Sequence, residues 1–163
     1  MMMKTFVIGP QCSGKTTLVE YLRTTTSLTV VEMDEEVRGL HGGEWPKNRH
    51  YKELVLVPRI LWAVRAMPEV MLFENHMSPR RTEKLRDVGF YVIGITVDEE
   101  ELLRRNAIRA AEQGYPDASS RVAGQVQQIN DLHRRNLIDM TISGQQPTEL
   151  IAEQIIAAHE RRT

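Results

Sequence analysis

The sequence predicts an α/β fold, a three-layer sandwich in which a five-stranded parallel sheet lies between layers of helices. Three observations lead to this prediction. Short apolar runs alternate along the chain with longer stretches of helical periodicity. The short runs are almost continuously apolar, which is typical of strands covered on both faces. The length of 163 residues suits one hydrophobic core, so residues 1–163 are expected to form a single domain.

Five runs are predicted as strands. In chain order they are Thr5–Ile8, Leu28–Glu32, Val70–Phe73, Phe90–Thr96 and Ile138–Ile142. Helical stretches separate most of them, and a strand–helix–strand order favours parallel pairing. Such sheets bind their ligands at the carboxyl ends of the strands. The residues that follow the strands are therefore the first candidates for a functional site.

Helices are predicted from apolar spacing and from end signals. In the stretch 50–67, Leu54, Val57, Leu61 and Val64 recur at three- and four-residue spacing. Six helices wrap the predicted sheet. They are Thr16–Thr25, His50–Met67, Pro79–Val88, Asp98–Glu112, Ser120–Arg135 and Thr148–Arg161.

Composition excludes several classes of protein. Lys and Arg number 21 and Asp and Glu 22, so the formal charge is −1, without the overall basic field of a protein that coats nucleic acid. Cys12 is the only cysteine, so no internal disulfide can form. No apolar run approaches the roughly 20 residues of a membrane-spanning helix, and the N-terminal residues lack a signal-peptide apolar stretch. We expect a soluble cytoplasmic protein with no membrane partner.

The strongest signal is the segment GPQCSGKT at residues 9–16, which matches the phosphate-binding pattern GxxxxGK[ST] directly after the first predicted strand. Glycines let backbone N–H groups turn toward phosphate oxygens, and the following helix adds its own N-terminal N–H groups. Lys15 supplies a charge for the β- and γ-phosphates, and Thr16 a hydroxyl for Mg²⁺. The expected nucleotide-binding residues are Gly9, Gln11, Cys12, Ser13, Gly14, Lys15, Thr16, Thr17 and Arg105.

Acidic residues follow the second and third predicted strands. Asp34, next to Glu35, is placed to take a proton from an attacking hydroxyl, and Arg38 to bind a negatively charged acceptor. The alternative is that the acids only favour the start of a helix. Glu74 ends the third strand, where a carboxylate can hold Mg²⁺ through water. The alternative is that Glu74 is a solvated acid in a loop without a metal role.

Arginines gather on the predicted helix after the fourth strand. Arg105 and Arg109 are four residues apart and share a helix face, as a clamp on a nucleotide requires. Phosphoryl transfer spreads negative charge, which arginines from a closing segment stabilise. The alternative is pairing with Glu100 and Glu101 on the exposed helix surface. Surface pairing is the expectation for three further arginines, Arg104, Arg134 and Arg135.

Together these motifs resemble those of small P-loop kinases, especially the kinase domain of bacteriophage polynucleotide 5′-hydroxyl kinase. In that family an acid ends the third strand and a Pro-Arg-rich helix follows, as in residues 74–81 here. The sequence RNAIR at 105–109 is similar to the family's Arg-Asn-x-x-Arg helix, and 114–117 to the loop after it. The framework also resembles nucleoside monophosphate kinases and shikimate-type kinases.

The resemblance implies an enzyme that transfers the γ-phosphoryl group of ATP, with Mg²⁺, to a hydroxyl or phosphate acceptor. It implies Asp34 as the base, with two departures from the family pattern. First, Asp34 precedes Arg38 by four residues instead of three. Glu35 has the three-residue spacing and is therefore an alternative base. Second, Glu74 stands where the family has Asp. The implied catalytic residues are Lys15, Asp34, Arg38, Arg105 and Arg109, and the implied metal ligands are Thr16 and Glu74.

The expected acceptor is a nucleoside, nucleotide or nucleic acid with a free hydroxyl at a polynucleotide end or on a modified base. Residues 38–65 interleave Lys, Arg and His with Trp45 and Tyr51, which suits a phosphorylated, stackable acceptor; the alternative is a solvated basic helix face. Residues 38–66 are the expected acceptor-side lid and 105–121 the ATP lid. Two other functions stay open, a small-metabolite kinase of shikimate type and an NTP-binding switch or regulatory ATPase.

Overall fold

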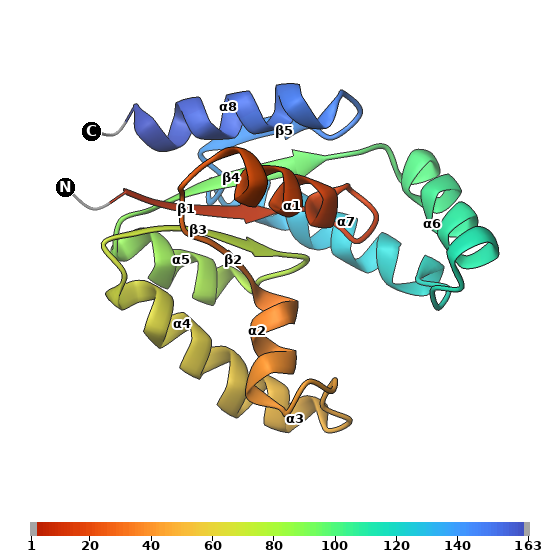
Figure 1. The fold of residues 1–163 in the computed structure, drawn as a ribbon, viewed down its shortest axis with the longest axis horizontal. Helices are drawn as coiled ribbons and strands as arrows, with labels where there is room; N and C mark the ends of the chain where they lie inside the picture. The colour runs from red at the N-terminus through yellow and green to blue at the C-terminus, as the bar shows by residue number, and fades with distance from the viewer. Residues whose placement is uncertain (1–2, 162–163) are drawn as a thin grey trace.

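The computed structural model describes residues 3–161 and confirms the predicted fold class (Figure 1). Five strands form one parallel sheet in the order β2-β3-β1-β4-β5. β1 pairs with β3 on one side and β4 on the other, so the loop after β1 opens at the middle of the carboxyl edge. The strands are β1 Met3–Ile8, β2 Val30–Glu32, β3 Glu69–Glu74, β4 Phe90–Thr96 and β5 Met140–Ser143.

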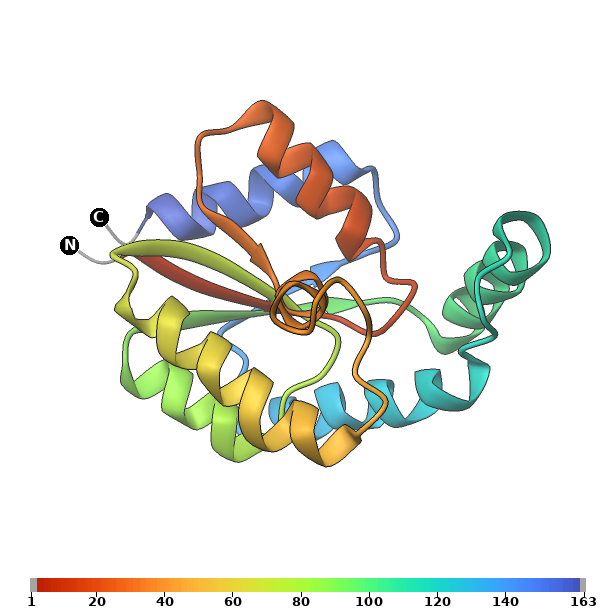
Figure 2. The same ribbon diagram turned by 60° about the horizontal axis from the view of Figure 1, so that its bottom comes forward.

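Helices cover both faces of the sheet (Figure 2). α1 and α8 pack on one face, whereas α4, α5 and α7 pack on the other, and α6 lies apart from the sheet in both views. Within the described residues, no helix combines the length and apolar character needed to cross a bilayer. The α-helices are α1 Lys15–Thr25, α2 Met33–Leu40, α3 Arg49–Tyr51, α4 Val57–Ala66, α5 Pro79–Asp87, α6 Glu99–Gln113, α7 Ser119–Arg134 and α8 Thr148–Glu160.

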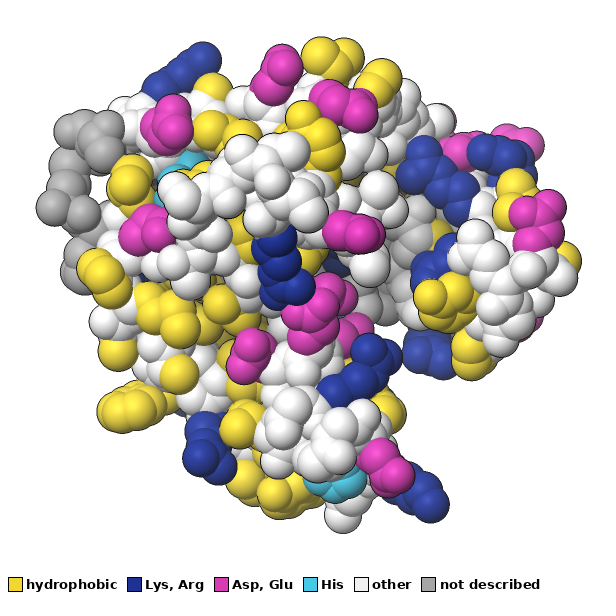
Figure 3. Space-filling view, viewed as in Figure 1, with side chains coloured by type: hydrophobic (Ala, Val, Ile, Leu, Met, Phe, Trp, Pro, Cys, Tyr) yellow, Lys and Arg dark blue, Asp and Glu magenta, His cyan; other side chains and the backbone are white. Residues whose placement is uncertain are grey.

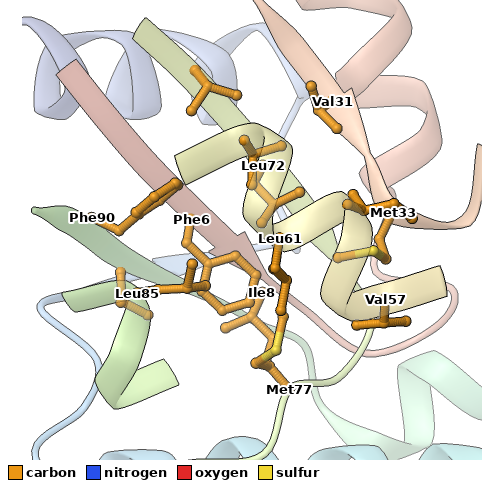
Figure 4. Close-up of a cluster of buried hydrophobic side chains, with 14 of the residues drawn as sticks. Phe6, Ile8, Val31, Met33, Val57, Leu61, Leu72, Met77, Leu85 and Phe90 are labelled. Carbon is orange, nitrogen blue, oxygen red and sulfur yellow. The ribbon is translucent and has the colours of Figure 1, made fainter. Parts of the chain in front are cut away.

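Side chains of the central strand alternate between the two halves of the core. Phe6 and Ile8 face the cluster beneath α4 and α5, where Figure 4 shows them beside Leu61 and Leu85. Val7 faces α1 and α8. Complete burial of an aliphatic or aromatic side chain of this size contributes about 1.5–3 kcal/mol. The strand ends that carry the site are therefore fixed by the core on both faces.

The second strand runs directly into a helix, which differs from the prediction. β2 has only three residues. The backbone N–H of Thr29, just before it, bonds to the Glu69 carboxylate (3.1 Å), while the Thr29 carbonyl still accepts from the N–H of Met71 in β3 (2.8 Å). α2 starts at the next residue, Met33, so Asp34 lies in a first helical turn. β5 begins at Met140, two residues later than predicted.

The helix predicted over 50–67 is divided into α3, a π-helical turn named η1 (Lys52–Leu56) and α4. Pro58 has no N–H and its ring crowds the carbonyl four residues earlier, so regular α-helical bonding is interrupted. The N–H of Val57 bonds instead to the carbonyl of Lys52, five residues back. Turns of this kind occur often at functional sites.

Candidate active site

Residues 9–16 form the loop between β1 and α1. The backbone is left-handed at Cys12 (φ 67°) and at Gly14 (φ 92°). A Cβ added to Gly9 would lie 2.8 Å from Ser13 Oγ, so only glycine fits there. Left-handed residues of this kind form concave nests of backbone N–H groups that bind anions, and the N-terminus of α1 lies at the end of the loop. The loop therefore has a backbone conformation that suits an anion.

Lys15 is buried inside this loop. Its Nζ donates hydrogen bonds to the carbonyls of Gly9 (2.5 Å) and Pro10 (2.7 Å) and to Ser13 Oγ (3.1 Å). Burial lowers the pKa of Lys15 from 10.5 to about 8, although the nearby Glu74 carboxylate opposes the shift. An ammonium held in this way gains most from an anion that enters the loop, because the anion compensates the cost of burial.

Carboxyl groups from two neighbouring strand ends face the lysine. Glu74, the last residue of β3, is buried, and burial together with the Asp34 charge raises its pKa to about 8. Asp34 accepts a hydrogen bond from Asn75 Nδ2 (3.3 Å), which joins the start of α2 to the loop after β3. The structure therefore brings together Lys15, Asp34 and Glu74, which are separate in the sequence.

Glu35, the alternative base, is turned away from this group. Its carboxylate accepts two hydrogen bonds from the Arg23 guanidinium on α1, at 3.0 and 2.7 Å, and both side chains are exposed. The ion pair occupies both of its oxygens. Of the two adjacent acids, Asp34 is the one that lies beside the lysine and Glu74.

Arg105 and Arg109 both contact the loop at residues 9–16 but in different ways. Arg105 donates to Glu101 (2.8 Å), to the Cys12 carbonyl (3.3 Å) and to the Gly144 carbonyl (3.2 Å). Arg109 contacts Cys12 Sγ (3.3 Å) and lies over the Tyr115 ring, 4.4 Å from its centroid. Arg105 thus makes the Glu101 pair named as an alternative and also contacts the loop, whereas within residues 3–161 Arg109 donates only to Cys12 Sγ.

The remaining arginines behave as surface residues. Arg104 pairs with Glu101 (2.7 Å), and the two ion pairs lower the pKa of that carboxyl to about 2. Arg134 and Arg135 both pair with Asp131. These contacts confirm the surface pairing predicted for the three arginines.

On the other side of the phosphate loop, cations surround an exposed tryptophan. Arg38 of α2 and Lys52 of η1 lie over the Trp45 ring, 5.6 and 4.8 Å from its centroid. Tyr51 lies near His41 with ring centroids 6.1 Å apart. Figure 3 shows a hollow between the α6 side and the body of the molecule, with Lys and Arg side chains on both of its sides.

Oxygen ligands suited to Mg²⁺ lie at the loop. Thr16 offers an exposed hydroxyl, and Asp34 and Glu74 offer carboxylates. The described residues contain no group of three or more His, Cys, Asp or Glu that could hold a metal by themselves. Mg²⁺ keeps several waters and takes one or two carboxylates with substrate phosphates, so this donor set fits it.

Sequence reasoning missed several residues of the site. Glu32 is half-buried at the end of β2, and burial, together with the charge of Glu35, raises its pKa. Asn106 bonds to Asp117 (2.6 Å) and to the N–H of Ala118 (2.8 Å), which fixes the loop after α6. Both carried a signal in the sequence, Glu32 by its position at a strand end and Asn106 as part of the RNAIR segment, but neither was given a role.

No protein-family model matches the chain, and no curated protein matches it in sequence. Solved structures match its fold. Shikimate kinase from Acinetobacter baumannii in complex with shikimate has a TM-score of 0.72 at 17% identity, over 100% of this chain and 96% of that chain. A gluconokinase from Sinorhizobium meliloti 1021 has a TM-score of 0.68 at 18% identity, over 99% and 94% of the two chains.

A chain of the Pnkp1/Rnl/Hen1 RNA repair complex matches with a TM-score of 0.65 at 19% identity, over 83% of this chain and 47% of that chain. Together with the shikimate kinase and the gluconokinase, it defines the fold class. The chain has the five-stranded P-loop fold of the shikimate kinase and the gluconokinase.

Proposed function

We propose that the protein is an ATP-dependent phosphotransferase that moves the γ-phosphoryl group to an acceptor hydroxyl. One observation carries the proposal: the buried Lys15 of a complete phosphate loop lies with Asp34 and Glu74 at the carboxyl edge of the sheet. A loop for the donor phosphates and carboxylates for the acceptor side are the two halves that in-line transfer requires.

Each part of the site has a role in this proposal. The loop and Lys15 bind the phosphates, and Arg109 stabilises charge on the transferring group. Asp34 accepts the proton of the acceptor hydroxyl. Thr16 and Glu74 would hold Mg²⁺, Glu74 through water, and the ion would neutralise charge on the β- and γ-phosphates. Residues 38–66 and 105–121 are proposed as the acceptor-side and ATP lids.

The proposed acceptor is a nucleoside, a nucleotide or a nucleic acid. Arg38 and Lys52 at the exposed Trp45 ring supply cations and an aromatic surface, which is the combination that binds phosphorylated bases. A small hydroxylated metabolite is the second candidate, because the shikimate kinase and the gluconokinase share this fold over nearly their whole length.

A screen with radiolabelled ATP tests the proposal. The acceptors are nucleosides, nucleotides, oligonucleotides with free ends, hydroxymethylated DNA, gluconate and shikimate. We expect slow hydrolysis alone and faster ATP consumption with labelled product for one acceptor class, and neither for Lys15→Ala. Hydrolysis that is indifferent to every acceptor would contradict the proposal and favour a nucleotide switch.

A further inference from the structure

Helix α7 contacts two loops of the proposed active site through side-chain amides. Gln125 Oε1 accepts a hydrogen bond from the backbone N–H of Gln11 in the phosphate loop, at 2.7 Å. Gln128 Oε1 accepts one from the backbone N–H of Met77, at 3.1 Å, in the loop that follows Glu74. A backbone N–H can only donate, so each amide oxygen faces its loop. The two glutamines are three residues apart and share one face of the helix.

The helix that carries them is firmly anchored. Ile129 and Leu132 are buried in the core beneath the sheet. Nearer its N-terminus, Val122 belongs to a small buried cluster with Leu102 of α6, against which Cys12 of the phosphate loop packs. Close-packed interiors resist displacement, so α7 is a rigid support for both loops.

The contact with the second loop extends to the proposed base. Met77, held by Gln128, is buried and lies two residues after Asn75. Asn75 donates a hydrogen bond to Asp34 Oδ2 at 3.3 Å. Hydrogen bonds thus link the phosphate loop to α7, and α7 to the short loop segment 75–77 that bonds to Asp34.

We propose that Gln125 and Gln128 are positioning residues, which hold the phosphate loop and the loop after β3 at a fixed spacing. The inference rests on the proposed phosphotransferase function and adds a role for α7. Gln125 keeps Gln11 in place beside the left-handed Cys12 before nucleotide binds, so the loop needs less ordering on binding. Gln128 holds the loop that orients Asp34, so it acts on the transfer step.

Three glutamines on α7 provide a matched experiment. Gln127 is exposed and its side-chain amide makes no hydrogen bond within residues 3–161, so Gln127→Met is the control for Gln125→Met and Gln128→Met. Methionine keeps the length of the side chain and removes the amide oxygen. The measurements are the Kd of fluorescent MANT-ATP with Mg²⁺, the turnover of ATP with water as acceptor, and the melting temperature.

Gln125→Met should weaken MANT-ATP binding about three- to tenfold, the size of one lost hydrogen bond. Gln128→Met should leave the Kd unchanged and lower turnover by a similar factor of about three to ten. Gln127→Met should change neither. A positioning role thus predicts that one variant changes only the Kd and the other only the turnover. A merely structural role predicts a lower melting temperature in both variants without this difference.

Equal Kd values for Gln125→Met and Gln127→Met would overturn the inference, and so would tighter binding by Gln125→Met, because the amide would then compete with phosphate. Unchanged turnover in Gln128→Met would overturn it for the second loop. If the wild-type protein does not bind MANT-ATP, the proposed function itself fails. If the wild-type protein binds MANT-ATP and both variants have its Kd and its turnover, only the positioning role is overturned.

Discussion

Lys15 and Glu74 are both buried at the carboxyl edge of β1 and β3, and burial moves their pKa values toward each other, to about 8 in each case. Each group lies in the field of the other, which favours the charged form of both. A phosphate anion beside the ammonium and a cation beside the carboxylate would each compensate the cost of burying these charges. The pair therefore links the stability of the protein to the occupancy of its site.

Replacement of Glu74 by Gln should change the pH dependence of stability. The pKa of Glu74 is raised from 4.5 to about 8, so the folded protein binds this proton more tightly than the unfolded chain does. The proton therefore adds to the free energy of unfolding at low pH, and this contribution is lost as the pH rises from 4.5 toward 8. Glutamine resembles the protonated form at every pH. The free energy of unfolding of Glu74→Gln should therefore exceed that of the wild-type protein by an amount that grows by at least about 1 kcal/mol between about pH 5 and about pH 8.

Urea unfolding of both proteins without nucleotide or Mg²⁺ measures this difference. Comparison within the pair removes most of the contribution of neighbouring groups that both proteins share, including Lys15, Asp34 and Lys52. A difference that stays constant across the pH range would show that Glu74 titrates normally.

Asp34→Asn and Glu35→Gln should have very different effects on turnover. Asp34 lies with Asn75 beside the phosphate loop, and loss of a general base lowers rates about 10²–10⁴-fold. Glu35 holds only an exposed ion pair with Arg23, so its loss should cost about 1 kcal/mol of stability or less and leave turnover near normal. Steady-state rates and melting temperatures of the two variants decide the question; equal, mild rate losses would mean that neither is the base.

Replacement of Arg105 and of Arg109 by alanine should have different effects on turnover and stability. Arg109→Ala is expected to lower turnover about 10³-fold or more with little change in stability, because its guanidinium has few protein partners. Arg105→Ala removes bonds to the Cys12 and Gly144 carbonyls and should lower the melting temperature as well as nucleotide affinity. Arg104→Ala is the control, since Arg104 pairs only with Glu101 on the surface. Normal turnover in Arg109→Ala would remove its proposed role.

Much of this arrangement could be predicted because its signals are local in the sequence. The phosphate loop is a contiguous motif, and the five strands are apolar runs, so the fold and the position of Lys15 follow directly. The shortness of β2 was missed, because it involves a tertiary bond from Thr29 to Glu69. The π turn was also missed, although Pro58, which interrupts regular helical bonding, is visible in the sequence.

The finer structure of the site depends on contacts between distant segments. Spacing could not separate Asp34 from Glu35, because the ion pair with Arg23 that turns Glu35 away comes from another helix. Gln125 gave no signal either, since it lies 114 residues from the loop that it contacts. Residues of this kind are found only when the packing of the helices is known.

Isothermal titration of ATP in the presence of Mg²⁺ measures whether the loop around Lys15 binds a triphosphate. The wild-type protein should bind ATP, and Lys15→Met should bind it about tenfold more weakly or worse, as expected for loss of a charge-assisted hydrogen bond. Lys47→Met, a change at an exposed lysine outside the loop, should bind like the wild type. Equal affinity of the wild type and Lys15→Met, or no binding by either, would contradict the account.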